Sequence, residues 1–233
     1  TIPDSVPSIG FCAFYNCTSL TEITIPDSVT HLSYSSFYDT AYYHDFSNIE
    51  MGYLYINNHL LYVNSQNVGE CEIREGTKTI AGDALSYCRK ITSIKIPDSV
   101  VSIGNSAFRN CTGIETITIP DSVVSIGNSA FSNCTGIETI TIPDSVESLG
   151  SYAFEGCTNL KSIKLSENIK ELDYYTFKDC VALETIVIPD SVTSIADYVF
   201  VGCDNLKSID IPESVNKIAR YAFYDSASGV LGD

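Results

Sequence analysis

Cysteine is the reactive residue type that this chain carries at a regular spacing. Thiols could pair as disulfides, but one residue per unit in a constant register is typical of an inward-facing ladder, where free cysteine acts as a small apolar side chain. We therefore expect structural thiols at these places, and the state of Cys12 and Cys71, outside the register, stays open. Seven of the nine cysteines share the register, with a spacing of 23 residues from the second onward: Cys17, Cys88, Cys111, Cys134, Cys157, Cys180 and Cys203.

Carboxylates recur in the same way and raise the question of a metal. A stacked row of them could hold Ca²⁺, which takes oxygen ligands from flexible loops. The glycine-rich nonapeptide of calcium-binding β-rolls is absent, however, and capping of a turn after proline explains the acidic residues at least as well. Calcium is the less favoured interpretation, so we expect no metal and no cofactor. The row consists of Asp4, Asp27, Glu75, Asp98, Asp121, Asp144, Glu167, Asp190 and Glu213.

The remaining chemistry-bearing residues do not point to catalysis. The spacings of His31, His44 and His59 match no metal-ligand pattern, and the chain contains no G-x-S-x-G, H-E-x-x-H or phosphate-binding glycine loop. We therefore expect no enzyme. The formal net charge of −16 argues against nucleic acid as a partner, because phosphates require a basic surface. No apolar run approaches the ~20 residues of a membrane helix.

The elements that position these residues come from a repeat. Ile96–Thr118 and Ile119–Thr141 are identical except that Arg109 is replaced by Ser132. A fixed period of about 20–29 residues is typical of a solenoid. We expect one solenoid over residues 1–233: two repeats in 1–47, an irregular unit in 48–72, and seven 23-residue repeats in 73–233, the last incomplete.

Each unit predicts one coil. Ile114-x-x-Ile117-x-Ile119 has the spacing of a short parallel strand that Pro120 ends. A second extended segment, Val123-x-x-Ile126, follows, and we expect Gly127 to allow a sharp corner. The apolar spacing of Ala130-Phe131-x-x-Cys134 favours one turn of α- or 3₁₀-helix. Eight of the ten Phe share the Phe131 place and predict a second inward ladder.

The irregular unit concentrates Tyr and Asn. Residues 53–56 and 60–63, separated by Asn57-Asn58-His59, predict a β-hairpin. One interpretation is a variant coil that keeps the solenoid continuous. The other is a ligand site, because Tyr with Asn suits an adaptable binding surface. The candidate residues are Tyr42, Tyr43, Tyr53, Tyr55 and Tyr62.

The phrase I-P-x-S-V-x-x-I-G-x-x-A-F-x-x-C-x-x-L-x-x-I resembles the BspA-like class of leucine-rich repeats over nearly the whole chain. The resemblance implies a β-rich α/β solenoid, a right-handed superhelix with parallel strands and short α/3₁₀ turns. It also implies an extracellular or cell-surface location, although no leader or anchor is visible, and no enzyme activity. Several family members are adhesins, which implies host or cell-surface proteins or glycans as partners.

The exposed strand positions supply a second candidate surface. Lysines gather on this face of an otherwise acidic chain, which predicts a partner site. The competing interpretation is that Thr and Ser suit exposed strands and Lys keeps the face soluble. For the whole chain, the alternative to an adhesin-type module is a structural stalk that carries a binding or anchoring domain elsewhere. The candidate residues on this face are Lys95, Lys161, Lys164, Lys207 and Asp210.

Overall fold

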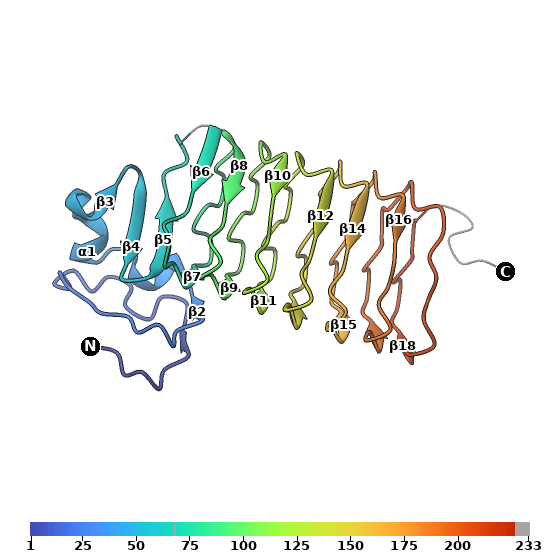
Figure 1. Cartoon of the computed structure of the whole chain (residues 1–233), viewed down its shortest axis with the longest axis horizontal. Helices are drawn as coiled ribbons and strands as arrows, with labels where there is room; N and C mark the ends of the chain where they lie inside the picture. Colours follow the sequence, from blue (N-terminus) through green and yellow to red (C-terminus); the bar gives the residue numbers. More distant parts are fainter. Residues whose placement is uncertain (68, 227–233) are drawn as a thin grey trace.

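The chain folds into a β-solenoid of about nine stacked turns (Figure 1). The structure is a computed structural model and describes residues 1–67 and 69–226. The predicted fold class is confirmed: strands of successive coils pair in parallel, and the little helix present lies between residues 34 and 48. Two strand faces run along the solenoid, and in Figure 1 they form its upper and lower rims.

Face 1 carries the strands of the leucine-rich-repeat spacing. Its two sheets, in the orders β10-β8-β6 and β12-β14-β16, are parallel throughout. Within a coil, the outward positions are exposed, as at Thr139 and Thr141, while Ile140 between them is buried. The strands are β6 (Gly69–Glu72), β8 (Ile91–Lys95), β10 (Thr116–Ile117), β12 (Thr139–Thr141), β14 (Ser162–Lys164) and β16 (Thr185–Ile186).

Face 2 carries the second extended segment of each coil. One sheet has the order β13-β11-β9-β7-β5-β4-β3 and another the order β15-β17-β18. The regular strands are β7 (Thr79–Ile80), β9 (Ser102–Ile103), β11 (Ser125–Ile126), β13 (Ser148–Leu149), β15 (Glu171–Leu172), β17 (Ser194–Ile195) and β18 (Lys217–Ile218).

The core between the faces is a set of stacked side chains. In the coil from Ile119, the side chains of Val123, Ala130, Phe131 and Cys134 are fully buried. Phe131 stacks on Phe108 and Phe154 with ring centroids 5.2 and 5.3 Å apart. The predicted Phe ladder is confirmed, and stacking of this kind stabilises beyond the burial of area alone.

The helical turn expected at Ala-Phe-x-x-Cys is replaced by consecutive hydrogen-bonded turns in the regular coils. The reason is backbone conformation: Ser129 and Asn133 have φ of 55° and 58°, in the left-handed region, which interrupts a right-handed helix. The interruption turns amide groups toward the next coil, so that Phe131 N donates to Ala153 O at 2.8 Å. The segment is therefore a third line of coil-to-coil hydrogen bonding.

Glycine is required at the predicted corner for a different reason from the one expected. Gly127 does not have a positive φ. A Cβ placed on it would lie 2.6 Å from the backbone N of Asn105 in the preceding coil. Close approach of two backbones, rather than a sharp corner, requires the missing side chain.

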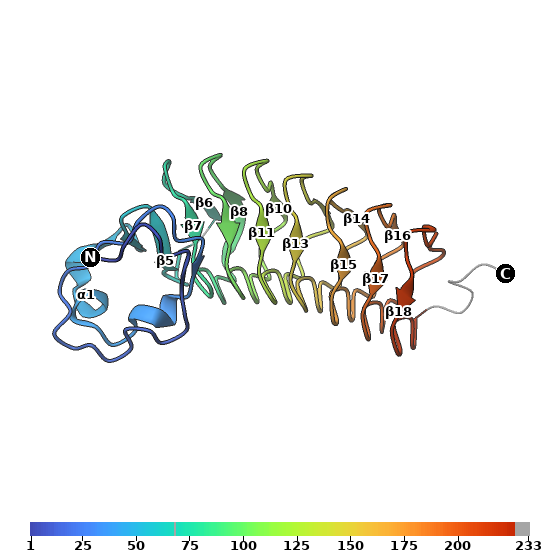
Figure 2. The same cartoon turned by 90° about the horizontal axis from the view of Figure 1, so that it is seen from below.

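The N-terminal part departs from the regular stack. The antiparallel hairpin expected in the irregular unit is present as β4 (Tyr53–Ile56) and β5 (His59–Val63), and β5 pairs in parallel with β7. The first two repeats form their own two-stranded sheet, β1 (Ser8–Ile9) with β2 (His31–Leu32). Between β2 and β4 lie η1 (Tyr34–Phe37), α1 (Ala41–His44), η2 (Phe46–Asn48) and β3 (Ile49–Glu50). Figure 2 shows this part at one end of the solenoid.

Candidate functional site

The cysteine ladder is structural. All nine cysteines are free thiols. From Cys111 onward each ladder thiol donates to a carbonyl of the preceding coil, as Cys134 Sγ does to Phe108 O at 3.0 Å. Burial raises the pKa of the Cys157 and Cys203 thiols to about 12, and that of Cys134 far above its ordinary value. Thiols held in the neutral form are poor nucleophiles and poor metal ligands.

Cys17 is the exception to the predicted ladder. Cys17 is exposed, whereas the other six ladder cysteines are buried. Cys71, which sequence reasoning left open, is buried and accepts a hydrogen bond from Tyr53 Oη at 3.3 Å. Cys12 is partly buried.

The carboxylates and imidazoles do not converge. Within residues 1–67 and 69–226, no group of three or more His, Cys, Asp or Glu side chains could hold a metal ion. In the acidic row, Asp144 Oδ1 accepts from the backbone N of Glu167 in the next coil at 3.0 Å. The Asp144 carboxylate therefore caps a backbone amide, which agrees with the turn-capping interpretation of the acidic row. His44 pairs with Asp39 at 2.9 Å, and His59 is buried against Pro26 O, so the histidines lie in separate surroundings.

Three of the four candidate lysines on face 1 are already paired. Lys95, Lys161 and Lys207 contact Glu72, Glu138 and Glu184 of the neighbouring coil at 2.6–2.8 Å. Such exposed pairs stabilise by about 0–1 kcal/mol at most. They also neutralise the positive charge from which a partner site on face 1 was predicted. Lys164 makes no ion pair within the described residues.

The same candidates do not form one cluster. Lys161 and Lys164 share the coil of β14, whereas Lys95 lies on β8, three coils away, and Lys207 lies next to Ser208, which pairs with Thr185 of β16. Asp210 is exposed farther along the face. A shallow hollow of about 470 Å³ brings Lys164 together with Thr118 and Thr141. The binding role of these five residues stays a prediction.

The candidate tyrosines lie on α1, β4 and β5, and their rings are half-buried against the core. Tyr42 Oη donates to Tyr55 O at 2.7 Å, and Tyr55 Oη accepts from Arg74 N at 3.1 Å. Burial raises the pKa of Tyr43 to about 12. Much of the hydrogen-bonding capacity of these tyrosines is therefore used within the chain. Their role as binding residues also stays a prediction. Tyr62 lies on β5, and Tyr53 lines a hollow described next.

Two exposed apolar side chains between α1 and β4 were missed by sequence reasoning. Phe46 on η2 is 81% exposed and Met51, in the turn between β3 and β4, is 92% exposed. Met51 has φ of 50°, a conformation that long side chains rarely adopt. Together with Tyr53, Gln66 and Arg74, Met51 lines a hollow of about 800 Å³. Phe46 is not among the residues that line this hollow.

Register was the signal that could have found these residues. Eight phenylalanines keep the ladder position, and the two that leave it, Phe11 and Phe46, are 79% and 81% exposed. Phe11 stands where the copied repeats have Asn105 and Asn128. Both phenylalanines that leave the ladder register therefore lie at the surface, whereas the eight others hold the ladder position.

No helix of the described chain is long and apolar enough to cross a membrane. No curated protein matches the chain. Among solved structures, a leucine-rich-repeat protein of T. pallidum is 28% identical with a TM-score of 0.60, over 73% of this chain and 78% of that one. A leucine-rich-repeat protein of Eubacterium ventriosum is 20% identical, with a TM-score of 0.53, over 88% of this chain and 64% of that chain.

The pneumococcal vaccine antigen PcpA is 21% identical, with a TM-score of 0.52, over 90% of this chain and 53% of that chain. The last two similarities show the fold alone. The model of the BspA type leucine rich repeat region matches residues 1–115 and 101–229, with six copies. These matches cover nearly the entire sequence, and the chain belongs to the family of BspA-type leucine-rich-repeat proteins.

Proposed function

We propose that this chain is a non-catalytic recognition module of a cell-surface or secreted protein, which binds a macromolecular partner through its irregular N-terminal part. The observation that carries the proposal is the pair of exposed side chains Phe46 and Met51, in a unit that breaks the repeat. In an array selected only for stacking, such groups would be costly to keep in water. Membership of the BspA-type leucine-rich-repeat family supports the module and its location.

Face 1 is the less favoured surface. Its lysines are mostly paired with glutamates of neighbouring coils, and the Thr pairs of β10 and β12 lie in copied sequence. A finely specified site would differ from coil to coil. The irregular unit differs from every other coil and combines aromatic, apolar and charged groups around one hollow, which is the composition of a protein-binding patch.

A structural stalk is the second candidate function. The observation that favours it is the near identity of Ile96–Thr118 and Ile119–Thr141, since a spacer needs only stacking. In that case the exposed apolar groups would contact no partner, and the folded chain would bind none of the targets tested.

The test is retention of the folded protein on arrayed matrix proteins and glycans. The double variant Phe46→Ser/Met51→Ser should lose retention on the recognised target, because it removes the exposed apolar contacts. The matched control is Val187→Ser, which removes an apolar side chain that is 77% exposed on face 1. Retention lost only in the control would place the site on face 1, and no retention of the wild-type protein on any target would favour the stalk.

A further inference from the structure

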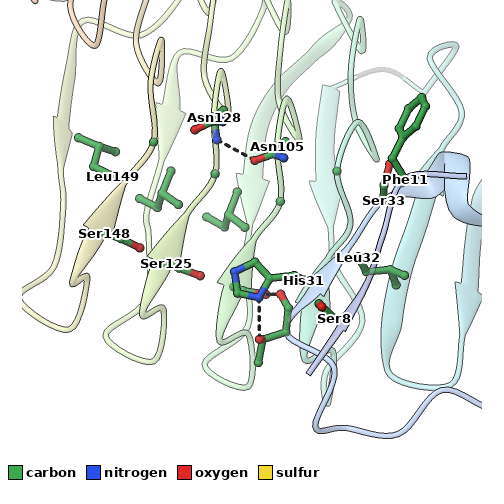
Figure 3. A pocket seen from close by; sticks show the side chains of 18 of the residues that line it. Ser8, Phe11, His31, Leu32, Ser33, Asn105, Ser125, Asn128, Ser148 and Leu149 are labelled. Atoms are coloured by element: carbon green, nitrogen blue, oxygen red, sulfur yellow. Dashed lines mark hydrogen bonds between the residues drawn. The ribbon is translucent and has the colours of Figure 1, made fainter. Parts of the chain in front are cut away.

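A groove separates the first two repeats from the regular solenoid. The β1–β2 sheet meets face 2 at the parallel bridge between Ser33 and Gly82, where Gly82 N donates to Leu32 O at 2.6 Å and Tyr34 N donates to Gly82 O at 3.1 Å. Beyond this junction, the two strands and the outer side of β9, β11 and β13 enclose a groove of about 570 Å³ (Figure 3). This volume is in the ordinary range of ligand sites.

The floor of the groove repeats the same polar groups from coil to coil. Ser125 and Ser148 are paired residues of β11 and β13, and their hydroxyls line it. Asn105 Oδ1 accepts from Asn128 N at 2.8 Å, and Asn128 Oδ1 accepts from Ser151 N at 3.0 Å. These bonds fix both side chains and leave the amide NH₂ groups as donors.

The two ends of the groove differ in chemistry. Phe11, 79% exposed, lies at the end formed by the first repeat, and Ser148 lies at the opposite end in Figure 3. The carboxylates of Glu147, Glu171 and Asp173 line the region around and beyond Ser148, together with the single ammonium group of Lys170. The groove thus combines an aromatic ring, fixed amides, hydroxyls and hydrogen-bond-accepting carboxylates along a line that crosses several coils.

We propose that this groove binds a neutral, linear oligosaccharide. Sugar hydroxyls both donate and accept, as do the floor groups, and carboxylates accept from pairs of hydroxyls. The ring of Phe11 offers a surface on which the apolar face of a sugar ring can pack. A ligand that repeats along its length suits a floor that repeats along its length. Anionic glycans are disfavoured because the three carboxylates outnumber Lys170 at this end of the groove.

A peptide fits this groove less well. Extended peptides bind by adding to an unpaired strand edge or by filling side-chain pockets. Of the strands in the floor, β9 and β11 are already paired on both sides, and only β13 and β1, at the margins of the groove, keep one unpaired edge. The apolar residues beneath the groove, Ile126 and Leu149, are at most 5% exposed and belong to the core, so they offer no pocket.

The proposal rests on the proposed recognition role, but it uses neither Phe46 nor Met51. The test is native gel electrophoresis through gels that contain a soluble neutral polysaccharide: β-glucan, xylan, mannan or dextran. The net charge of −16 moves the protein without added detergent. We expect at least one polysaccharide to retard the wild-type protein, and Phe11→Ser to weaken that retardation at least tenfold.

Ser125→Tyr should abolish the retardation by filling the groove. Its matched control is Ser194→Tyr, which makes the same change at the same repeat position on β17, outside the groove. Phe46→Ser/Met51→Ser should be retarded as strongly as the wild type, which separates this proposal from the proposed function.

Three outcomes would overturn the assignment: no retardation by any polysaccharide, equal loss in Ser125→Tyr and Ser194→Tyr, or retardation unaffected by Ser125→Tyr and Phe11→Ser. Binding of polylysine that Ser125→Tyr removes, without binding of any polysaccharide, would instead make the groove a site for basic peptides.

Discussion

Buried thiols and one buried imidazole are the side chains whose protonation is most directly tied to folding. The ladder thiols are surrounded by core atoms and by the carbonyls to which they donate. His59 is buried, with Nε2 at 3.1 Å from Pro26 O and no partner for Nδ1. Burial disfavours the charged form in each case, so folding resists thiol ionisation at high pH and imidazole protonation at low pH.

The fall in the free energy of unfolding at alkaline pH should depend on the buried ladder thiols. The folded pKa of Cys134 is raised by burial far above its ordinary value of 9.0, so its stabilising effect is complete below pH 9 and is lost as pH rises above it. In this range Cys134→Ala should reduce the slope of the free energy of unfolding against pH by about 1.4 kcal/mol per pH unit. Urea unfolding at several pH values between 8 and 11 measures both slopes. Identical slopes would contradict a buried neutral thiol.

The fall in the free energy of unfolding at acid pH should depend on the buried imidazole of His59. Burial lowers its pKa below the ordinary 6.5, so the unfolded chain takes up a proton that the folded protein refuses, and stability falls as pH drops below 6.5. His59→Gln should remove a slope of up to about 1.4 kcal/mol per pH unit. His31→Gln, at an exposed position, serves as the control in the same urea titration. An unchanged acid limb in His59→Gln would refute the buried neutral imidazole.

At the scale of the element, tight turns replace the helical turn that apolar spacing indicated. Spacing predicts which side chains point inward, and the inward assignments of Ala130, Phe131 and Cys134 are confirmed by their burial. It does not predict the backbone path between them. Ser129 and its equivalent Tyr152 both adopt a positive φ, and neither residue type signals it. The turns arise from hydrogen bonding to the next coil, which is a tertiary interaction.

Glycine at the corner of each coil gives an element-scale prediction with an internal control. Gly127→Ala would place a Cβ 2.6 Å from the Asn105 backbone N, whereas a Cβ on Gly10, at the same repeat position, meets no atom within 4 Å. Overpacking of this kind costs roughly 1–3 kcal/mol. Thermal unfolding should therefore show a clear drop in Tm for Gly127→Ala and almost none for Gly10→Ala. Equal drops would mean that backbone flexibility, not close approach, explains these glycines.

At the scale of the whole molecule, the solenoid is a sum of coils and their interfaces. Repeat length, parallel stacking and the Phe and Cys ladders could be predicted because each depends on register. The groove beside β9, β11 and β13 could not, because it depends on how the first two repeats meet Gly82, about two coils later in sequence. The binding role of the candidate tyrosines stays a prediction, and the sequence did not single out the exposed apolar side chains Phe46 and Met51.

The loss of stability when a ladder phenylalanine is replaced by alanine should depend on the position of that phenylalanine along the stack. Phe131 is fully buried between two neighbouring rings, whereas Phe223 is half-buried and stacks on Phe200. Phe131→Ala should destabilise by about 3–5 kcal/mol, and Phe223→Ala by clearly less. Chemical unfolding of both variants measures the difference. A larger loss at Phe223 would contradict stabilisation by two neighbours.

The central claim is recognition through the irregular unit, and affinity for a retained target tests it most directly. The dissociation constant would be measured for the wild type, for Phe46→Ser/Met51→Ser and for Val187→Ser. We predict at least a tenfold weaker affinity for the double variant, which is about 1.4 kcal/mol, and an unchanged affinity for the control. Equal affinity of the double variant and the wild type would contradict the claim.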